Sequence, residues 1–180
     1  MDHNDHVNLL RPADLEQGGS WADLGAGSGA FTFALRELIG ASASIHAVDK
    51  DRNDLNMLKK GYETRFGNSN NLKIIVGDFS HTLATPLPML DGIVMANSLH
   101  YFRDRVKTLG HVRSLLKPNG VLLVVEYNVD SGNPWVPYPF SFETFQKLTA
   151  QSGFSKPRLL AKHPSSFLRE FYSAFTQNQT

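Results

Sequence analysis

The sequence contains no cysteine, no strong excess of charge of either sign and no long apolar run. The absence of cysteine excludes disulfides, thiolate zinc sites and a cysteine nucleophile. Lysine and arginine number 18 against 17 aspartates and glutamates, a formal net charge of +1, which disfavours a dedicated nucleic-acid binder. No run approaches the ~18 apolar residues of a membrane span, and the first residues, MDHNDHVNLL, lack the apolar stretch of a signal peptide. We therefore expect a cytoplasmic protein, monomeric or homodimeric, with no membrane span and no nucleic-acid partner.

What remains is the composition of a globular domain, in which short apolar runs alternate with helical patterns. The chain has 180 residues, of which 41% are hydrophobic and 19% charged, so we expect a single domain, residues 1–180, with a short N-terminal extension. Strands are predicted at 21–24, 45–48, 72–76, 93–95 and 121–125, and several of these runs are nearly continuous, as a strand buried on both faces of a sheet requires. Amphipathic helices are predicted at 31–38, 55–66, 106–116 and 142–153, the last capped by Ser141.

The end of the chain departs from this alternation. Residues 158–163 and 168–175 are predicted as two strands joined only by Pro164-Ser165-Ser166. A link that short cannot make a parallel crossover, so this pair is expected to be antiparallel. The predicted fold class is therefore α/β, a doubly wound Rossmann-like sheet of seven strands, mostly parallel, with an antiparallel C-terminal hairpin.

A glycine-rich segment, Gly25-Ala26-Gly27-Ser28-Gly29-Ala30, leads directly from the first predicted strand into the first of these helices. Glycines at this position allow a sharp turn and a close approach of a ligand to the backbone, and the helix N-terminus beyond suits an anion. Gly25, Gly27 and Ala30 satisfy the G-x-G-x-x-A pattern of dinucleotide-binding proteins. Taken alone, the pattern leaves open a dinucleotide, another nucleoside cofactor or a tight turn without a ligand.

Aspartates stand at the ends of three successive predicted strands, where an open α/β sheet binds ligands. Asp23 lies two residues before the first glycine; a carboxylate there would repel a pyrophosphate but suit a cofactor with an ammonium and a sulfonium group. Asp49, followed by Lys50, is placed to bond ribose hydroxyls, which both cofactor classes share. Asp78 is placed to accept from an adenine amine while Phe79 packs beside the ring. Any one of these aspartates alone could equally be a helix cap or turn residue.

Five segments in order resemble the class I S-adenosyl-L-methionine-dependent methyltransferases. Residues 23–29 (DLGAGSG) resemble the first motif of that family, and Asp49 and 77–79 (GDF) match its acidic positions after the second and third strands. Residues 91–101 (DGIVMANSLHY) resemble the fourth-strand motif. Residues 115–126 (LLKPNGVLLVVE) are similar to the "helix, L-K-P-G-G, strand" signature. The likeness extends from about residue 21 to about residue 154, and is greatest to the small-molecule branch around the ubiquinone and menaquinone biosynthesis enzymes.

The resemblance implies S-adenosyl-L-methionine as cofactor, no metal, and O- or C-methylation of a small-molecule acceptor. It implies that the backbone near Gly25 and Asn97 holds the methionine amine and that Asp23 orients that end. Asp49 would bind the ribose and Asp78 the adenine. The full set of cofactor-binding candidates is Asp23, Gly25, Ala26, Gly27, Gly29, Asp49, Lys50, Asp78, Phe79 and Asn97.

An O- or C-methyl acceptor can require a base, and four residues at predicted strand ends are candidates. They are His100, Tyr101, Glu126 and Tyr127. His100 is the best proton acceptor near neutral pH, although a capping or supporting histidine is an equal alternative. Tyr101 and Tyr127 could line the acceptor pocket or be core aromatics. The proline-rich segment 133–140 that follows could cover the acceptor or be a stiff connector.

Two other functions compete with methyl transfer. The glycine pattern and Asp49 also suit an NAD-dependent oxidoreductase, although Asp23 and the C-terminal hairpin weigh against it. Only about twenty residues precede the first predicted strand, so the N-terminal helices that often roof the acceptor pocket in this family are expected to be short or missing. The chain could then be a cofactor-binding module whose acceptor site needs a partner chain. The acidic and histidine residues of the first six positions are interpreted as a solvated tail.

Overall fold

A computed structural model describes residues 1–179, which form one seven-stranded sheet in the order β3-β2-β1-β4-β5-β7-β6. Every neighbouring pair is parallel except the two pairs made by β7, which runs antiparallel to both β5 and β6. The predicted fold class is thereby confirmed, including the antiparallel C-terminal hairpin. The strands are β1 (Ser20–Leu24), β2 (Ser44–Asp49), β3 (Leu72–Val76), β4 (Leu90–Ala96), β5 (Leu116–Tyr127), β6 (Arg158–Pro164) and β7 (Glu170–Gln177).

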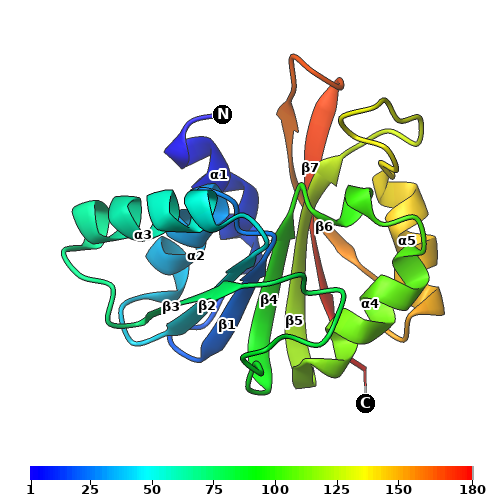
Figure 1. The fold of residues 1–180 in the computed structure, drawn as a ribbon. Coiled ribbons are helices and arrows are strands. Elements are labelled where there is room, and N and C mark those ends of the chain that lie inside the picture. The colour runs from blue at the N-terminus through cyan, green and yellow to red at the C-terminus, as the bar shows by residue number, and fades with distance from the viewer. Residues whose placement is uncertain (180) are drawn as a thin grey trace.

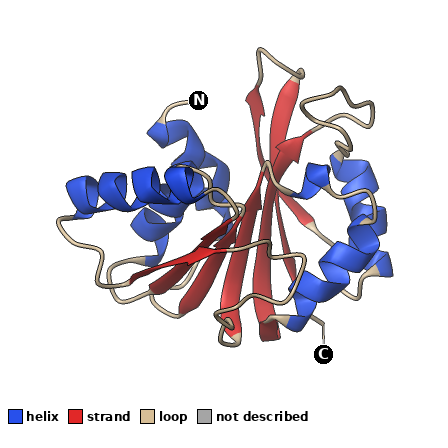
Figure 2. Ribbon diagram, in the orientation of Figure 1, coloured by secondary structure: helices blue, strands red, loops and turns tan. Residues whose placement is uncertain are grey.

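Helices cover both faces of this sheet (Figures 1 and 2). The first face carries α1 (His3–Leu10), α2 (Ala30–Ile39) and α3 (Arg52–Phe66), and the second carries α4 (Arg105–Ser114) and α5 (Phe142–Gln151). Alternate strand residues supply the two cores: Val94 and Leu123 belong to the first, Ile93 and Leu122 to the second. Such burial on both sides explains why these strands have nearly continuous apolar sequences. Short 3-10 turns follow α1 (Arg11–Ala13) and β4 (Leu99–Tyr101).

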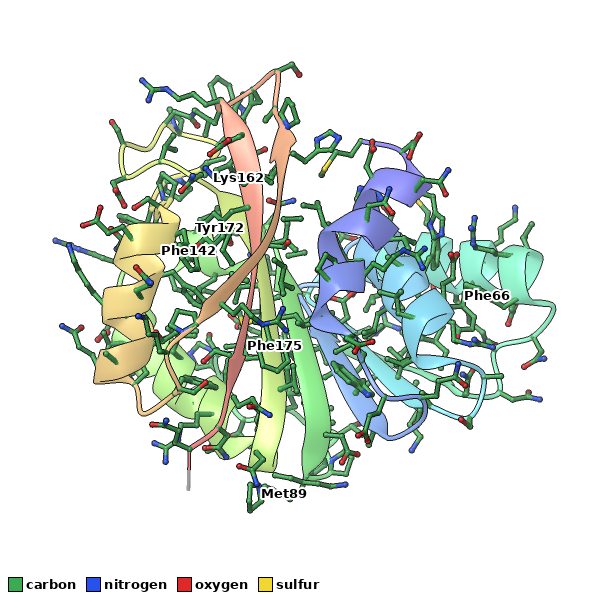
Figure 3. The ribbon with its side chains drawn as sticks, turned by 180° about the vertical axis from the view of Figure 1, so that it is seen from behind. Phe66, Met89, Phe142, Lys162, Tyr172 and Phe175 are labelled. Carbon is green, nitrogen blue, oxygen red and sulfur yellow. The ribbon has the colours of Figure 1, made fainter. Side chains whose placement is uncertain are left out.

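Aromatic residues pack on both faces of the sheet. From behind, Phe142, the first residue of α5, lies beside Tyr172 of β7, with ring centroids 5.8 Å apart, whereas Phe66 at the end of α3 lies on the other side of the molecule (Figure 3). Ser141 caps α5 as predicted, because its hydroxyl accepts a hydrogen bond from the Thr144 N–H.

The turn between β6 and β7 is longer than the three residues predicted. Pro164 still pairs with Glu170, so the link is formed by residues 165–169. The Ser165 hydroxyl accepts hydrogen bonds from the N–H groups of Phe167 and Leu168, and Arg169 has a left-handed φ of 56°. These bonds take Leu168 out of the strand in which the apolar pattern places it, and β7 begins only at Glu170.

The N-terminal segment is a docked helix, so its interpretation as a solvated tail is wrong. Asp2 and Asp5 form a reciprocal capping box that starts α1. The carbonyl of Leu9 accepts a 2.6 Å hydrogen bond from the buried Ser173 hydroxyl of β7, and Asp5 lies 3.3 Å from His163 of β6. The helix is short, as expected, but it closes the first face of the sheet next to β6. Within residues 1–179, no helix is long and apolar enough to cross a membrane.

Candidate active site

Gly25, the first residue of the glycine loop after β1, lines a cleft at the carboxyl edge of the sheet. This edge is the upper one in Figure 1. Gly25 has a φ of 84°, and a Cβ there would lie 2.5 Å from the Ser98 Cβ. Gly29, with a φ of 97°, begins α2, and a Cβ there would lie 2.6 Å from Leu58. Both positions therefore require glycine for backbone conformation and for packing. The loop is fixed because the N–H groups of Gly25 and Ala26 both donate to the Val48 carbonyl.

Asp49, at the end of β2, contacts this loop directly and also lines the cleft. One carboxylate oxygen accepts the Gly27 N–H at 2.9 Å, and the other accepts the Asp51 N–H at 2.9 Å. Each oxygen can accept a further hydrogen bond, because a carboxylate has about four lone-pair sites. The side chain is therefore held in place and retains acceptor capacity for a diol. Lys50 is exposed and also lines the cleft.

Asp78 and Phe79 follow β3 on the same side of the cleft. The Ser80 hydroxyl donates to the Asp78 carboxylate at 2.6 Å, and this bond is the main cause that lowers the pKa of Asp78. The carboxylate is thus ionised at neutral pH and able to accept from an amine. Phe79 is buried against Phe102, with ring centroids 5.2 Å apart, and contributes an apolar wall.

The cleft has a volume of about 550 Å³, within the range of small-molecule sites. Its charged lining consists of four aspartates and one lysine: Asp49, Asp51, Asp54, Asp78 and Lys50. Such a lining disfavours a pyrophosphate and suits a ligand with positive charge and hydroxyl groups. Of the predicted cofactor residues, it brings together Gly25, Asp49, Lys50, Asp78, Phe79 and Asn97.

Asn97 ends β4 with a left-handed φ of 53°. Its side-chain Oδ1 is buried and has no hydrogen-bond partner among the described residues. The next residue, Ser98, donates to the Leu24 carbonyl at 2.8 Å and so ties the end of β4 to the end of β1. Because a buried carbonyl without a donor is unfavourable, Asn97 Oδ1 is a good candidate to receive an ammonium or hydroxyl of a ligand.

Asp23 does not line the cleft. Its side chain is buried beneath α2, where the Thr32 hydroxyl donates to it at 2.6 Å. Burial raises the pKa of Asp23 to about 7, and the negative charge of Asp49 adds to this, whereas the Thr32 hydrogen bond opposes it. Asp23 can therefore influence a bound cofactor through the glycine loop and through its charge. A direct contact between the Asp23 carboxyl group and the cofactor remains a prediction.

The raised pKa of Asp23 leads to a stability prediction. The folded pKa of about 7 lies above the ordinary value of 3.8, so the folded state binds more protons between these two values. The free energy of unfolding should then fall as pH rises from about 4 to about 7, by on the order of 4 kcal/mol. Asp23→Asn, which keeps an acceptor for Thr32, should remove most of this fall in urea denaturation measured across that range. An equally steep fall in the variant would contradict the assignment.

His100 and Glu126 form a buried pair at the same edge of the sheet. His100, in the 3-10 turn after β4, is 2% exposed, and Glu126 of β5 is 0% exposed. His100 Nδ1 lies 2.7 Å from Glu126 Oε2, and Glu126 Oε1 accepts the N–H groups of Leu99 and His100 at 3.0 and 3.2 Å. With the ring proton on Nδ1, three donors converge on this one carboxyl group, an arrangement that suits a carboxylate.

The other ring nitrogen, His100 Nε2, is buried and lacks a hydrogen-bond partner within residues 1–179. In this tautomer Nε2 carries a lone pair, so it is a proton acceptor held in a fixed direction by a carboxylate. Both residues are among the candidates predicted from the sequence, but local patterns do not pair them. The pairing depends on the register of β4 and β5, in which Ala96 lies opposite Val125.

Tyr101 and Tyr127 flank His100. The ring of Tyr101 lies 4.3 Å from the imidazole and is largely exposed, and the ring of Tyr127 lies 6.1 Å away. Burial, together with the nearby Glu126 and Tyr101, raises the pKa of Tyr127, which therefore keeps its phenolic proton at neutral pH. Tyr127 is therefore a poorer candidate for the base than its position alone indicates.

The proline-rich segment after β5 packs against this pair. The Tyr138 N–H donates to the His100 carbonyl at 3.0 Å, and Arg105 Nη1 donates to the Tyr138 carbonyl at 2.7 Å. Phe140 is fully buried in the second core.

A further cleft of about 500 Å³ lies at the opposite, amino edge of the sheet, beside Trp21, Asp91 and Lys117. That cleft contains none of the predicted site residues.

Comparison with known proteins agrees with this architecture. The methyltransferase domain family matches residues 15–166. The chain is 26% identical over 157 residues to demethylmenaquinone methyltransferase of Staphylococcus carnosus, covering 80% of this chain and 60% of that protein. It is 30% identical over 90 residues to the probable cobalt-precorrin-6B C(15)-methyltransferase (decarboxylating) of Saccharolobus solfataricus, covering 50% and 45%. The chain thus spans less than two thirds of the length of these curated relatives.

The fold has a close counterpart among solved structures. The YcgJ protein of Bacillus subtilis superimposes with a TM-score of 0.78 over 99% of this chain and 100% of that one, at 14% identity. The match to a methyltransferase family favours S-adenosylmethionine over a dinucleotide, the choice that the glycine pattern left open. The chain belongs to the methyltransferase domain family, and its fold is that of the class I S-adenosylmethionine-dependent methyltransferases.

Proposed function

We propose that this protein transfers a methyl group from S-adenosylmethionine to a carbon or oxygen of a small-molecule acceptor, with His100 as the base. The observation that carries the proposal is the pairing of His100 with Glu126, which leaves Nε2 buried and unpartnered among residues 1–179. A methyl transfer to an acceptor that is already nucleophilic needs no base. An acceptor that must first lose a proton needs one, and the pair of His100 and Glu126 can provide it.

The residues of the acidic cleft fit the cofactor. Asp49 is oriented by two backbone N–H groups and is proposed to bind the ribose hydroxyls, and Asp78 is proposed to accept from the adenine amine. The buried Oδ1 of Asn97 and the backbone near Gly25 are proposed to hold the methionine amine. When bound, the cofactor supplies a methyl group activated by a sulfonium.

The role of the pair is to accept one proton from the acceptor. Nε2 of neutral His100 would take the proton, and the Glu126 carboxylate would stabilise the resulting imidazolium without itself being protonated. Burial strengthens this interaction, because the site excludes the water that would otherwise screen it. Suitable acceptors are a carbon flanked by a carbonyl or enol oxygen, or a phenol. The name of the Saccharolobus relative supports carbon as one target.

The Glu126→Gln variant tests this role directly. The glutamine side chain can still pack in the same volume. Its amide NH₂ group favours the imidazole tautomer that carries the proton on Nε2. It also offers no negative charge to stabilise an imidazolium. We expect methyl transfer to 1,3-dihydroxynaphthalene, which offers both phenols and an acidic carbon, to fall by at least about 100-fold. The measurement is single-turnover transfer from methyl-labelled S-adenosylmethionine, with calorimetric binding of S-adenosylhomocysteine as the control for an intact cofactor site. Wild-type rates in the variant would exclude the pair from the reaction.

A further inference from the structure

Exposed aromatic side chains gather beside His100. Trp135 in the segment after β5 is 70% exposed, Phe167 in the β6–β7 turn 51% and Tyr101 59%. The other large exposed hydrophobic side chains among the described residues belong mostly to other regions, such as Met57 on α3 and Met89 at the opposite end of the sheet (Figure 3). Exposed apolar groups that cluster in this way mark a binding surface more often than isolated ones do.

The aromatic residues form a continuous row that passes the base. The ring centroids of Trp135 and Phe167 are 6.4 Å apart, those of Phe167 and Tyr127 6.1 Å, those of Tyr127 and His100 6.1 Å, and those of His100 and Tyr101 4.3 Å. We call Trp135, Phe167, Tyr127 and Tyr101 the aromatic row. It joins three segments that are far apart in the sequence: the turn after β4, the segment after β5 and the β6–β7 turn.

The two most exposed segments of the row have braced backbone. The Asn133 side chain accepts the N–H groups of Trp135 and Val136 at 3.0 and 2.9 Å. On the other side, Ser165 donates its N–H to the Arg169 carbonyl at 2.7 Å and closes the turn that carries Phe167. Because the backbone of both segments is braced, only side-chain freedom has to be lost when a ligand binds, which favours binding.

Two charged residues near the row, Lys162 of β6 and Glu170 of β7, form an ion pair. Their charged atoms lie 2.6 Å apart, and Glu170 also accepts from Asn128 at 2.6 Å (Figure 3). The side chains of the row itself present aromatic faces and edges, and the phenol groups of its two tyrosines. Aromatic rings recognise a flat conjugated partner by offset stacking and edge contacts, which a puckered saturated ring of the same size cannot reproduce.

We propose that the aromatic row is the acceptor site, and that the acceptor is a flat, conjugated, largely apolar molecule whose reacting end lies at His100. The inference rests on the proposed function, because it assigns the substrate class to the same base. Trp135 and Phe167 bind the body of the acceptor and set its specificity. Tyr127 and Tyr101 orient the end that loses the proton.

The test compares two ligands that share a fused-ring skeleton and a hydroxyl but differ in flatness. Calorimetric titration with 2-naphthol and with decahydro-2-naphthol should give at least about tenfold tighter binding of the flat compound. The Trp135→Ala and Phe167→Ala variants should each lose most of this preference, by about tenfold in the Kd of 2-naphthol. Leu159→Ala, which removes an exposed apolar residue of β6 outside the row, is the matched control and should bind both compounds as the wild type does.

Several outcomes would overturn the inference. Equal affinity for the two compounds, or undiminished preference in both ring variants, would show that the row does not select flat acceptors. Sedimentation that shows a dimer in the wild type and a monomer in Phe167→Ala would show that a second copy covers the row instead. Separate titration with S-adenosylhomocysteine distinguishes the two proposals. If that ligand does not bind, the proposed function fails; if it binds and the flat preference is missing, only the aromatic-row inference fails.

Discussion

His100→Ala should lower the rate of methyl transfer by about 100-fold to 10,000-fold while leaving the affinity for S-adenosylhomocysteine unchanged. The imidazole combines a buried, unpartnered Nε2 with a carboxylate directed at its opposite nitrogen, among the residues that the structure describes. Removing it takes away the proton acceptor but no residue that lines the acidic cleft. The loss should therefore appear in kcat with 1,3-dihydroxynaphthalene as acceptor, and not in cofactor binding.

Two controls make this result interpretable. His111→Ala removes a histidine from the last turn of α4, where its side chain has no assigned role, and should retain wild-type activity. His100→Ala leaves the Glu126 carboxylate buried without its imidazole partner, so the folding of this variant has to be verified by circular dichroism before the rates are compared. If folded His100→Ala transferred methyl groups at more than about a tenth of the wild-type rate, another base would have to be sought.

Asp49→Ala should abolish measurable binding of S-adenosylhomocysteine, a loss of at least about 100-fold. Hydrogen bonds to a charged acceptor contribute about 1.5–3 kcal/mol each, and the proposed contact to the ribose makes two of them. The same carboxylate accepts the N–H of Gly27 and so braces the glycine loop. Its removal therefore weakens both the direct contact and the shape of the cleft.

The matched control for this variant lies in the same cleft. Asp54→Ala removes a carboxylate that lines the cleft from α3 but has no assigned contact with the ribose. We expect its Kd for S-adenosylhomocysteine to change by less than about fivefold, which corresponds to the loss of a screened charge. Equal losses in Asp49→Ala and Asp54→Ala would mean that the cleft binds by overall charge, and the assignment of the ribose to Asp49 would be wrong.

The sequence predicts those residues of the cofactor cleft that directly follow a parallel strand. Apolar runs locate the strands, and residues that follow parallel strands meet at one edge, which is why Gly25, Asp49 and Asp78 converge in the structure. Asp23 illustrates where this reasoning stops. It lies within β1, and its side chain points to the same face as Trp21, toward α2 and Thr32. The alternation of strand residues contains that information, but strand ends considered alone do not.

Features that depend on contacts between distant segments were not predictable in the same way. The pairing of His100 with Glu126 requires the 3-10 turn after β4 to fold back over the end of β5. The docking of α1 requires Leu9 to reach Ser173, which is 164 residues away in the sequence. The aromatic row likewise joins Trp135 and Phe167 only because β5 and β7 are neighbours in the sheet. In each case the partner is set by tertiary packing, which local patterns do not encode.

Calorimetric titration of the wild type with three ligands tests most directly that this chain is an S-adenosylmethionine-dependent methyltransferase. S-adenosylmethionine and S-adenosylhomocysteine should each bind saturably at one site per chain, and NADH should not bind, because the cleft is lined by four aspartates and a single lysine. Binding of NADH without binding of the other two ligands would contradict both the assignment of the cleft and the reaction derived from it.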